Sequence, residues 1–192
     1  MNEEQKALAM ECVREYVWSG FYDPDEIVEM IDEAAFRPGE IVHDWLRSQI
    51  ERAFREKQAE EASWPAESDC DRLDRVFASL GGDGILSLQN AGYTQSDGLD
   101  DVAQFYQEAG GEQSGIVGYC FYHGQDLERV MKRGDLYLAF GDVGRDDEKG
   151  AEIGRRIMRA FEAAGFAVEW DGTVKTRLLV KGIQWQRCRR SA

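Results

Sequence analysis

The side chains best suited to chemistry are concentrated around His123, which is one of only two histidines in the chain. The segment Gly118-Tyr-Cys-Phe-Tyr-His-Gly-Gln-Asp126 adds a hydroxyl (Tyr122), an amide (Gln125) and a carboxylate (Asp126). It joins the end of an expected strand to the start of an expected helix, where open α/β sheets most often bind ligands. These residues are therefore candidates for ligand binding or acid–base chemistry.

The side chains of this segment cannot all converge, because successive residues of a strand point to opposite faces of the sheet. Tyr119, Phe121 and His123 share one face, whereas Cys120 and Tyr122 share the other. A structural role for His123 stays open beside the functional one, because a histidine at a strand end can bond a backbone group. Cys120 has no basic neighbour that would favour a thiolate, so we expect it to be buried as a small apolar residue.

A second polar turn, Asn90-Ala-Gly-Tyr-Thr-Gln-Ser-Asp-Gly98, also follows an expected strand and precedes a helix. Asp97 is expected to cap that helix. If the two strands are parallel and adjacent, Tyr93, Thr94 and Asp97 can face His123 across one cleft. The sequence thus predicts a single concave surface that both turns line.

No motif in the chain predicts a metal, a cofactor or a named catalytic mechanism. Glycine-rich nucleotide loops, the G-x-S-x-G elbow and the H-E-x-x-H motif are all missing from the sequence. The C-x-x-H pair of Cys120 and His123 is two ligands short of a zinc site. The acidic run from Gly141 to Glu148 precedes an expected helix, where carboxylates satisfy free amide groups. We therefore expect no metal and no cofactor, and we assign no catalytic residue.

The chain carries a formal net charge of −14, and the charge is uneven along it. No acidic residue follows Asp171, whereas six basic ones do: Lys175, Arg177, Lys181, Arg187, Arg189 and Arg190. An acidic field repels nucleic acid and anionic membranes and attracts basic proteins. A basic protein is therefore the expected partner, although the charge can also serve solubility alone.

The four cysteines are widely spaced and form no C-x-x-C pair, which is typical of a reducing compartment. The chain begins with a charged helix in place of an apolar signal segment, and its apolar runs are too short to span a bilayer. These features predict a cytoplasmic protein.

Periodicity predicts an α/β fold, with α+β as an alternative class. Residues 1–62 read as helices and 68–190 as an α/β core, joined near Pro65, and we expect the helices to pack on the core. The core should hold about five short strands with packed helices. The expected strands are 85–88, 115–122, 135–140, 167–170 and 177–185. Gly150 and Gly154 lie one turn apart on the helix expected at 148–164, where their small size predicts close approach to the sheet.

Four segments resemble an uncharacterised bacterial family, a domain of unknown function: Asn90-Ala-Gly-Tyr-Thr-Gln, Gly118 to Glu128, Leu136-Tyr-Leu-Ala-Phe-Gly141 and Val168-Glu-Trp-Asp-Gly172. The resemblance covers about residues 68–190, and the segment 21–31 is similar too. It implies a cysteine-rich turn near 86–92, but this chain has no cysteine there. The resemblance supplies no activity.

Two classes of function follow from these observations. The first is a non-catalytic protein-binding module, of the inhibitor or immunity type, which presents an acidic surface to a basic partner. The second is a small-molecule-binding enzyme or sensor that uses both polar turns. Its candidate residues are Tyr93, Thr94, Asp97, Tyr122, His123, Gln125 and Asp126.

Overall fold

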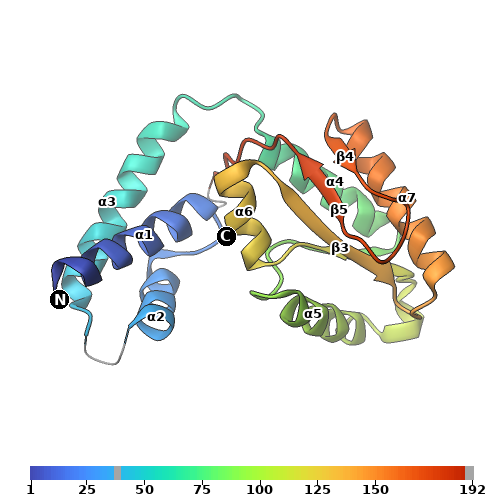
Figure 1. Ribbon diagram of the computed structural model, residues 1–192, viewed down its shortest axis with the longest axis horizontal. Helices are drawn as coiled ribbons and strands as arrows, with labels where there is room; N and C mark the ends of the chain where they lie inside the picture. Colours follow the sequence, from blue (N-terminus) through green and yellow to red (C-terminus); the bar gives the residue numbers. More distant parts are fainter. Residues whose placement is uncertain (37–39, 189–192) are drawn as a thin grey trace. The chain divides into compact units, whose positions relative to one another are not determined.

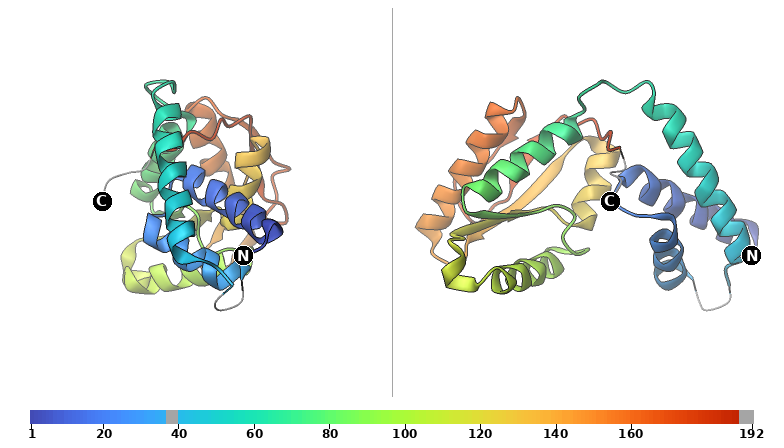
Figure 2. Two further views of the ribbon diagram at one scale, coloured as in Figure 1. Left: turned by 90° about the vertical axis from the view of Figure 1, so that its left-hand side faces the viewer. Right: turned by 180° about the vertical axis from the view of Figure 1, so that it is seen from behind.

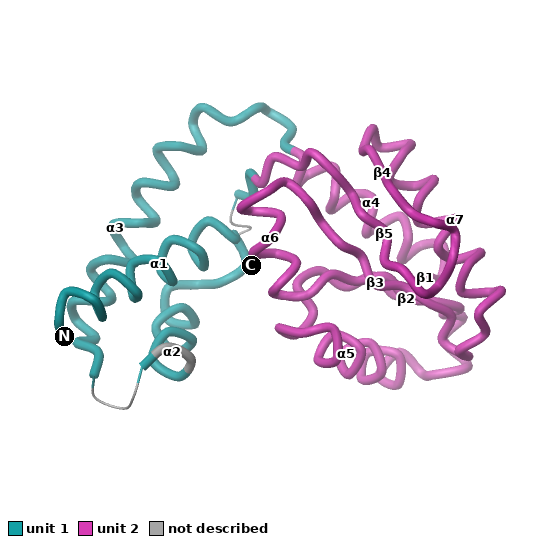
Figure 3. Tube along the Cα trace, in the orientation of Figure 1, with its two compact units in different colours: residues 1–68, 186–192 teal, residues 69–185 magenta. Residues whose placement is uncertain are grey.

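The structure is a computed structural model that describes residues 1–36 and 40–188, and these residues form two compact units (Figure 3). Unit 1 comprises residues 1–68 together with the C-terminal residues from 186 onward, and unit 2 comprises residues 69–185. Residues 189 and 190, at the end of the expected core domain, lie outside the described residues.

Three helices form the described part of unit 1: α1 (Glu3–Ser19), α2 (Pro24–Ala35) and α3 (His43–Glu61). Capping boxes begin α1 at Asn2 and α2 at Asp23, and in α2 a proline at the first position adds a preset backbone angle. The C-terminal segment joins this unit, since the guanidinium of Arg187 lies 4.6 Å from the ring centroid of Phe21. Apolar side chains from all three helices form its core: Val13, Val17, Ile27, Ile31, Leu46 and Ile50.

Unit 2 is built on a mixed five-stranded sheet in the order β1-β2-β3-β5-β4 (Figure 1). The strands are β1 (Ile85–Leu88), β2 (Gly118–Phe121), β3 (Leu136–Asp142), β4 (Ala167–Glu169) and β5 (Leu178–Lys181). The helices are α4 (Asp69–Gly82), α5 (Gln95–Glu108), α6 (Gly124–Arg133), α7 (Asp147–Ala163) and the 3₁₀ turn η1 (Gly111–Ser114). β1 and β2 are parallel, and the other neighbouring strands are antiparallel. The fold is α/β, as the sequence predicted.

Three strands are shorter than the sequence predicted, and the one expected at 167–170 ends one residue early, at Glu169. The strand expected at 115–122 covers only Gly118–Phe121, and Gly115 adopts a left-handed backbone with φ of 76°. The strand expected at 177–185 covers only Leu178–Lys181, and Gly182 turns the chain with φ of 73°. Glycine takes such angles at no steric cost, so each glycine marks a break in extended structure that hydrophobicity alone did not show.

One face of the sheet packs against α4 and α7 (Figures 1 and 2). A Cβ atom at Gly154 of α7 would lie 2.6 Å from Trp170 and 2.7 Å from Phe140. A Cβ atom at Gly150 would lie 2.8 Å from Val174. The absence of side chains at these positions allows α7 its close approach, as the sequence predicted.

The opposite face carries Tyr119 and Phe121 from β2 and Tyr137 and Ala139 from β3, in line with the register of the two strands. α5 covers the β1–β2 side of this face, where Gly98 leaves room for the ring of Phe121. α6 contacts β3, and Arg129 lies 5.1 Å from the ring centroid of Tyr137. His123 and Asp126 lie on this side of the sheet, where they contact Arg177, whereas Tyr122 points to the other side.

Candidate functional site

The two polar turns lie side by side because β1 and β2 are adjacent and parallel. The backbone amide of Ala91 donates to the carbonyl of Tyr122 at 2.9 Å, and that of Gly124 donates to Gly92 at 3.0 Å. The amide of Gln125 also donates to the carbonyl of Tyr93, at 3.2 Å. The adjacency on which the site prediction depended is therefore present in the structure.

Thr94 and Asp97 form the N-terminal cap of α5. The prediction that Asp97 is the N-cap of this helix is wrong, because the helix begins at Gln95, and Thr94, three residues before Asp97, is the N-cap. The Thr94 amide donates to Asp97 Oδ2 at 2.8 Å, which completes a capping box. Hydrogen bonds from Thr94 hold the pKa of Asp97 below its ordinary value. Both side chains thus have a structural partner within the turn.

Tyr122 lies in the core on the other side of the sheet from His123. Its ring makes edge contacts with Phe77, at a centroid distance of 5.7 Å, and with Trp185, at 6.3 Å. Its hydroxyl donates to Gln89 Oε1 at 3.1 Å. The side chain is fully buried, so alternation along the strand separates it from the rest of the candidates, as the sequence predicted.

His123 and Asp126 form a buried polar cluster with Arg177, which immediately precedes β5. Asp126 Oδ2 lies 2.8 Å from Arg177 Nη1 and 3.0 Å from His123 Nε2. The backbone amide of His123 donates to the same oxygen at 3.5 Å. The carboxylate side chain is 2% exposed, whereas that of Arg177 is 28% exposed. Arg177 therefore extends the buried cluster toward the surface.

The environment of His123 favours the neutral ring. Burial lowers the pKa of His123 and outweighs the Asp126 carboxylate, which raises it. The Arg177 guanidinium lowers it further, while the backbone of Tyr93 and the carboxylate of Asp97 raise it. Nε2 also lies 3.2 Å from Arg177 Nη1, so the neutral ring can either accept from Arg177 or donate to Asp126.

Sequence reasoning missed Arg177 as a site residue. It lies 51 positions from Asp126 along the chain, and only the pairing of β3 with β5 brings it to this face. Its guanidinium lies 4.9 Å from the ring centroid of Tyr137, and Arg129 makes a similar contact with the same ring. The one signal in the sequence is the basic segment after Asp171, which indicates a charge asymmetry but not the position of Arg177 in the fold.

Tyr93 and Gln125 lie at a second, shallow pocket of about 370 Å³ over α6. Tyr93 is exposed, and its hydroxyl donates to Glu128 Oε1 at 2.9 Å. The other lining residues come from α6 and are Glu128 and three basic side chains, Arg129, Lys132 and Arg133.

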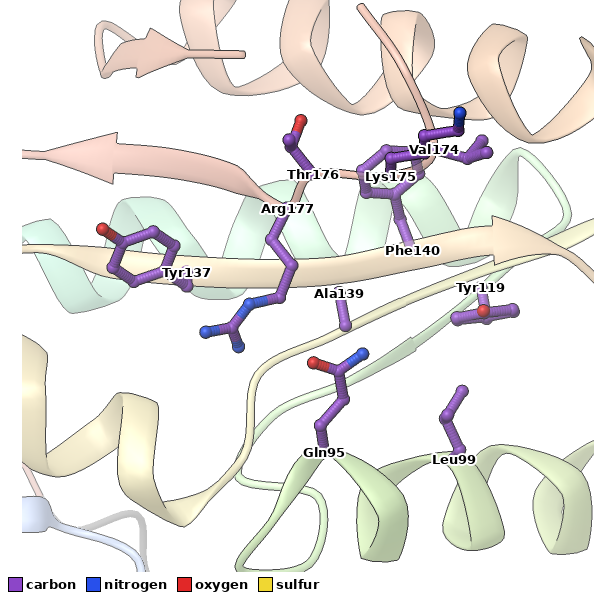
Figure 4. Close-up of a pocket in the computed structure, with 10 residues that line it drawn as sticks. All are labelled: Gln95, Leu99, Tyr119, Tyr137, Ala139, Phe140, Val174, Lys175, Thr176 and Arg177. Atoms are coloured by element: carbon purple, nitrogen blue, oxygen red, sulfur yellow. The ribbon is translucent and has the colours of Figure 1, made fainter. Parts of the chain in front are cut away.

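A pocket of about 430 Å³ lies on the sheet face between α5 and the loop that leads into β5 (Figure 4). Gln95 and Arg177 point toward one another across it. Tyr137 lies with Arg177 at one end, and Leu99 lies with Tyr119 at the other. The full lining is Gln95, Leu99, Tyr119, Tyr137, Ala139, Phe140, Val174, Lys175, Thr176 and Arg177.

The predicted site residues are therefore distributed over four places, of which the cap of α5 holds Thr94 and Asp97. His123 and Asp126 lie behind Arg177, Tyr93 and Gln125 line the second pocket, and Tyr122 lies in the core. Among the described residues, no group of three His, Cys, Asp or Glu side chains is placed to hold a metal ion. Burial raises the pKa of the Cys120 thiol well above its usual range, which leaves it a poor nucleophile.

Within the described residues, no helix has the length and apolar character needed to cross a membrane.

Comparisons with known proteins assign the family. No curated protein and no solved structure matches the chain. A family model described as a domain of unknown function (DUF6891) matches residues 2–189, which include the helical unit as well as the expected core. The chain belongs to the DUF6891 family.

Proposed function

We propose that unit 2 binds a small molecule in the sheet-face pocket and does so without catalysing a reaction. The pocket volume of about 430 Å³ lies within the range of ligand sites in proteins, and its lining combines aromatic and aliphatic surface with a few polar groups. This proposal keeps the small-molecule function that the two turns suggested and moves its centre to the neighbouring pocket.

The observation that carries the proposal is a set of hydrogen-bonding groups that face the pocket without a protein partner. The Gln95 amide and the Tyr119 hydroxyl make no hydrogen bond to any described residue. The same is true of Arg177 Nε and Nη2, since only Nη1 of this guanidinium is bonded. Polar groups that converge on a cavity without protein partners are suited to a ligand.

The geometry supports binding over catalysis. His123 is 4% exposed and is not among the residues that line the pocket. A general base must reach the proton that it removes, directly or through one water. In this proposal His123 and Asp126 hold Arg177 in place, and Arg177 contacts the ligand.

A fragment screen by NMR tests the proposal. Fragments of varied charge are added to ¹⁵N-labelled protein, and amide shifts are expected at Gln95, Leu99 and residues 174–177. Leu99→Trp fills the pocket from an exposed position and should abolish these shifts. Phe105→Trp is the matched control, because Phe105 is exposed on the same helix but does not line the pocket. Hits that map elsewhere, or that survive Leu99→Trp, would contradict the proposal.

Protein binding is the second candidate function, and the net charge of −14 favours it. Exposed acidic side chains on α5, such as Asp100 and Glu108, give a surface that a basic partner can contact. An inhibitor or immunity-type protein would capture one strongly basic protein from its host, and high salt would release it. Asp100→Asn with Glu108→Gln should weaken that capture, whereas Leu99→Trp in the pocket should not.

A further inference from the structure

We infer that the ligand of the sheet-face pocket is a small organic anion, with a carboxylate or phosphate group on an apolar body. This inference rests on the proposed function and names the chemical class of its ligand. It depends on the charge of the lining, the donors of Arg177 and the division of the pocket into a polar and an apolar end.

The lining of the pocket has the opposite charge to the protein. The chain has 37 acidic and 23 basic residues, yet the described lining residues include two cations, Lys175 and Arg177, and neither Asp nor Glu. Asp126 already balances the charge of Arg177 from behind. Lys175 is exposed and makes no ion pair with a described residue, so it supplies the uncompensated positive charge.

Arg177 presents donors in the geometry that carboxylates and phosphates accept. Its Nη1 is bound to Asp126, at 2.8 Å, which leaves the edge formed by Nε and Nη2 without a partner among the described residues. Two parallel N–H groups on one guanidinium edge bind a carboxylate or phosphate bidentately. Asp126 and Tyr137 fix the plane of this group, so little rotational freedom remains to be lost when an anion binds.

The other end of the pocket suits an apolar body. Leu99, Val174 and the ring of Tyr119 lie on the side away from Tyr137, and Ala139 lies between them and Arg177 (Figure 4). The Tyr119 hydroxyl and the Gln95 amide lie within the same lining and can accept as well as donate. The arrangement therefore favours an anion that carries an apolar or aromatic group over a bare inorganic ion.

Four aromatic probes of similar size test the inference by NMR titration: benzoate, phenyl phosphate, benzyl alcohol and benzylammonium. At least one of the two anions should bind about 10-fold tighter than the alcohol, as expected when a charge-assisted hydrogen bond replaces a neutral one. The ammonium compound should bind least. Whichever anion binds tighter distinguishes a carboxylate from a phosphate site, and either result supports the inference.

Three variants locate the anion. Arg177→Gln should weaken anion binding by about 10-fold or more, and Lys175→Gln, at an exposed position where folding is not at risk, should weaken it by a smaller factor. Arg129→Gln is the matched control, because Arg129 also lies over Tyr137 but does not line the pocket. The Arg129→Gln variant should bind the anions with the same affinity as the unaltered protein.

The results that would overturn the inference differ from those that would overturn the proposed function. If the alcohol or the ammonium compound binds in the pocket as tightly as the anions, the ligand class is wrong although the pocket still binds small molecules. Anion binding that all three variants leave unchanged would also refute the inference. If no probe shifts the pocket amides, the inference falls, and the fragment screen with Leu99→Trp decides whether the proposed function falls too.

Discussion

Arg177 Nη1 lies 2.8 Å from Asp126 Oδ2, so a residue immediately before β5 balances a carboxylate buried in the first turn of α6. Arg177→Met would leave that carboxylate buried without its cation. We expect the free energy of unfolding to fall by about 3 kcal/mol, measured by urea denaturation. Arg129→Met is the control, because it removes a similar contact with Tyr137 without breaking a buried ion pair. It should lower the free energy of unfolding by less than about 0.5 kcal/mol. Equal losses in the two variants would refute this role of the ion pair.

The burial of His123 makes stability depend on pH. Burial holds the pKa of His123 below its ordinary value of 6.5, so the unfolded chain takes up this proton more readily than the folded one. The stability that the neutral ring contributes is complete above pH 6.5 and is lost as pH falls from 6.5 toward the folded-state pKa. The slope from one such group is at most about 1.4 kcal/mol per pH unit.

His123→Gln isolates this pH effect from that of the many carboxylates. The difference in free energy of unfolding between the two proteins should be constant above pH 7 and should change as pH falls below 6.5. Urea denaturation at several pH values between 5 and 8 measures it. Stability curves that stay parallel over this range would show that His123 titrates alike in the folded and unfolded states.

Alanine substitutions at two helical glycines should change stability in opposite directions, because one glycine is closely packed and the other lies in open space. Gly154→Ala places a methyl group against Trp170 and Phe140, and overpacking of this kind costs about 1–3 kcal/mol. Gly81→Ala in α4 is the matched control, because no atom lies within 4 Å of its added methyl group. A helical glycine replaced by alanine in open space should raise stability by about 0.5–1 kcal/mol. Thermal denaturation of both variants checks the prediction, and a neutral Gly154→Ala would contradict it.

The expected boundary between the helical segment and the α/β core is open to limited proteolysis. Pro65, Ala66 and Glu67 are exposed between α3 and α4, and we expect the first cleavage there. Mass spectrometry should then find one C-terminal fragment that resists further digestion. Because Arg187 packs on Phe21 within unit 1, Arg187→Ala should speed the loss of the N-terminal fragment after cleavage. Cuts scattered through residues 69–185 would refute the boundary.

The sequence by itself predicted most of the elements, whereas the adjacency of the two turns was a condition that only the structure met. Strand Ile85–Leu88 has the predicted bounds, because apolar periodicity is a local signal. The alternation that separates Tyr122 from His123 is likewise a property of any strand. Strand ends were predicted less well, since glycines with left-handed backbone angles ended β5 and delayed β2.

Only the tertiary structure showed where the pocket lies and which residue completes the polar cluster. Asp97 was predicted as a site residue, but the start of α5 engages it in a capping box with Thr94. Arg177 joins the cluster because β5 pairs with the distant strand β3 as well as with β4, its neighbour in sequence, and no local pattern encodes the pairing with β3. Periodicity sets which face a side chain takes, whereas the order of strands in the sheet sets which distant side chains meet on that face.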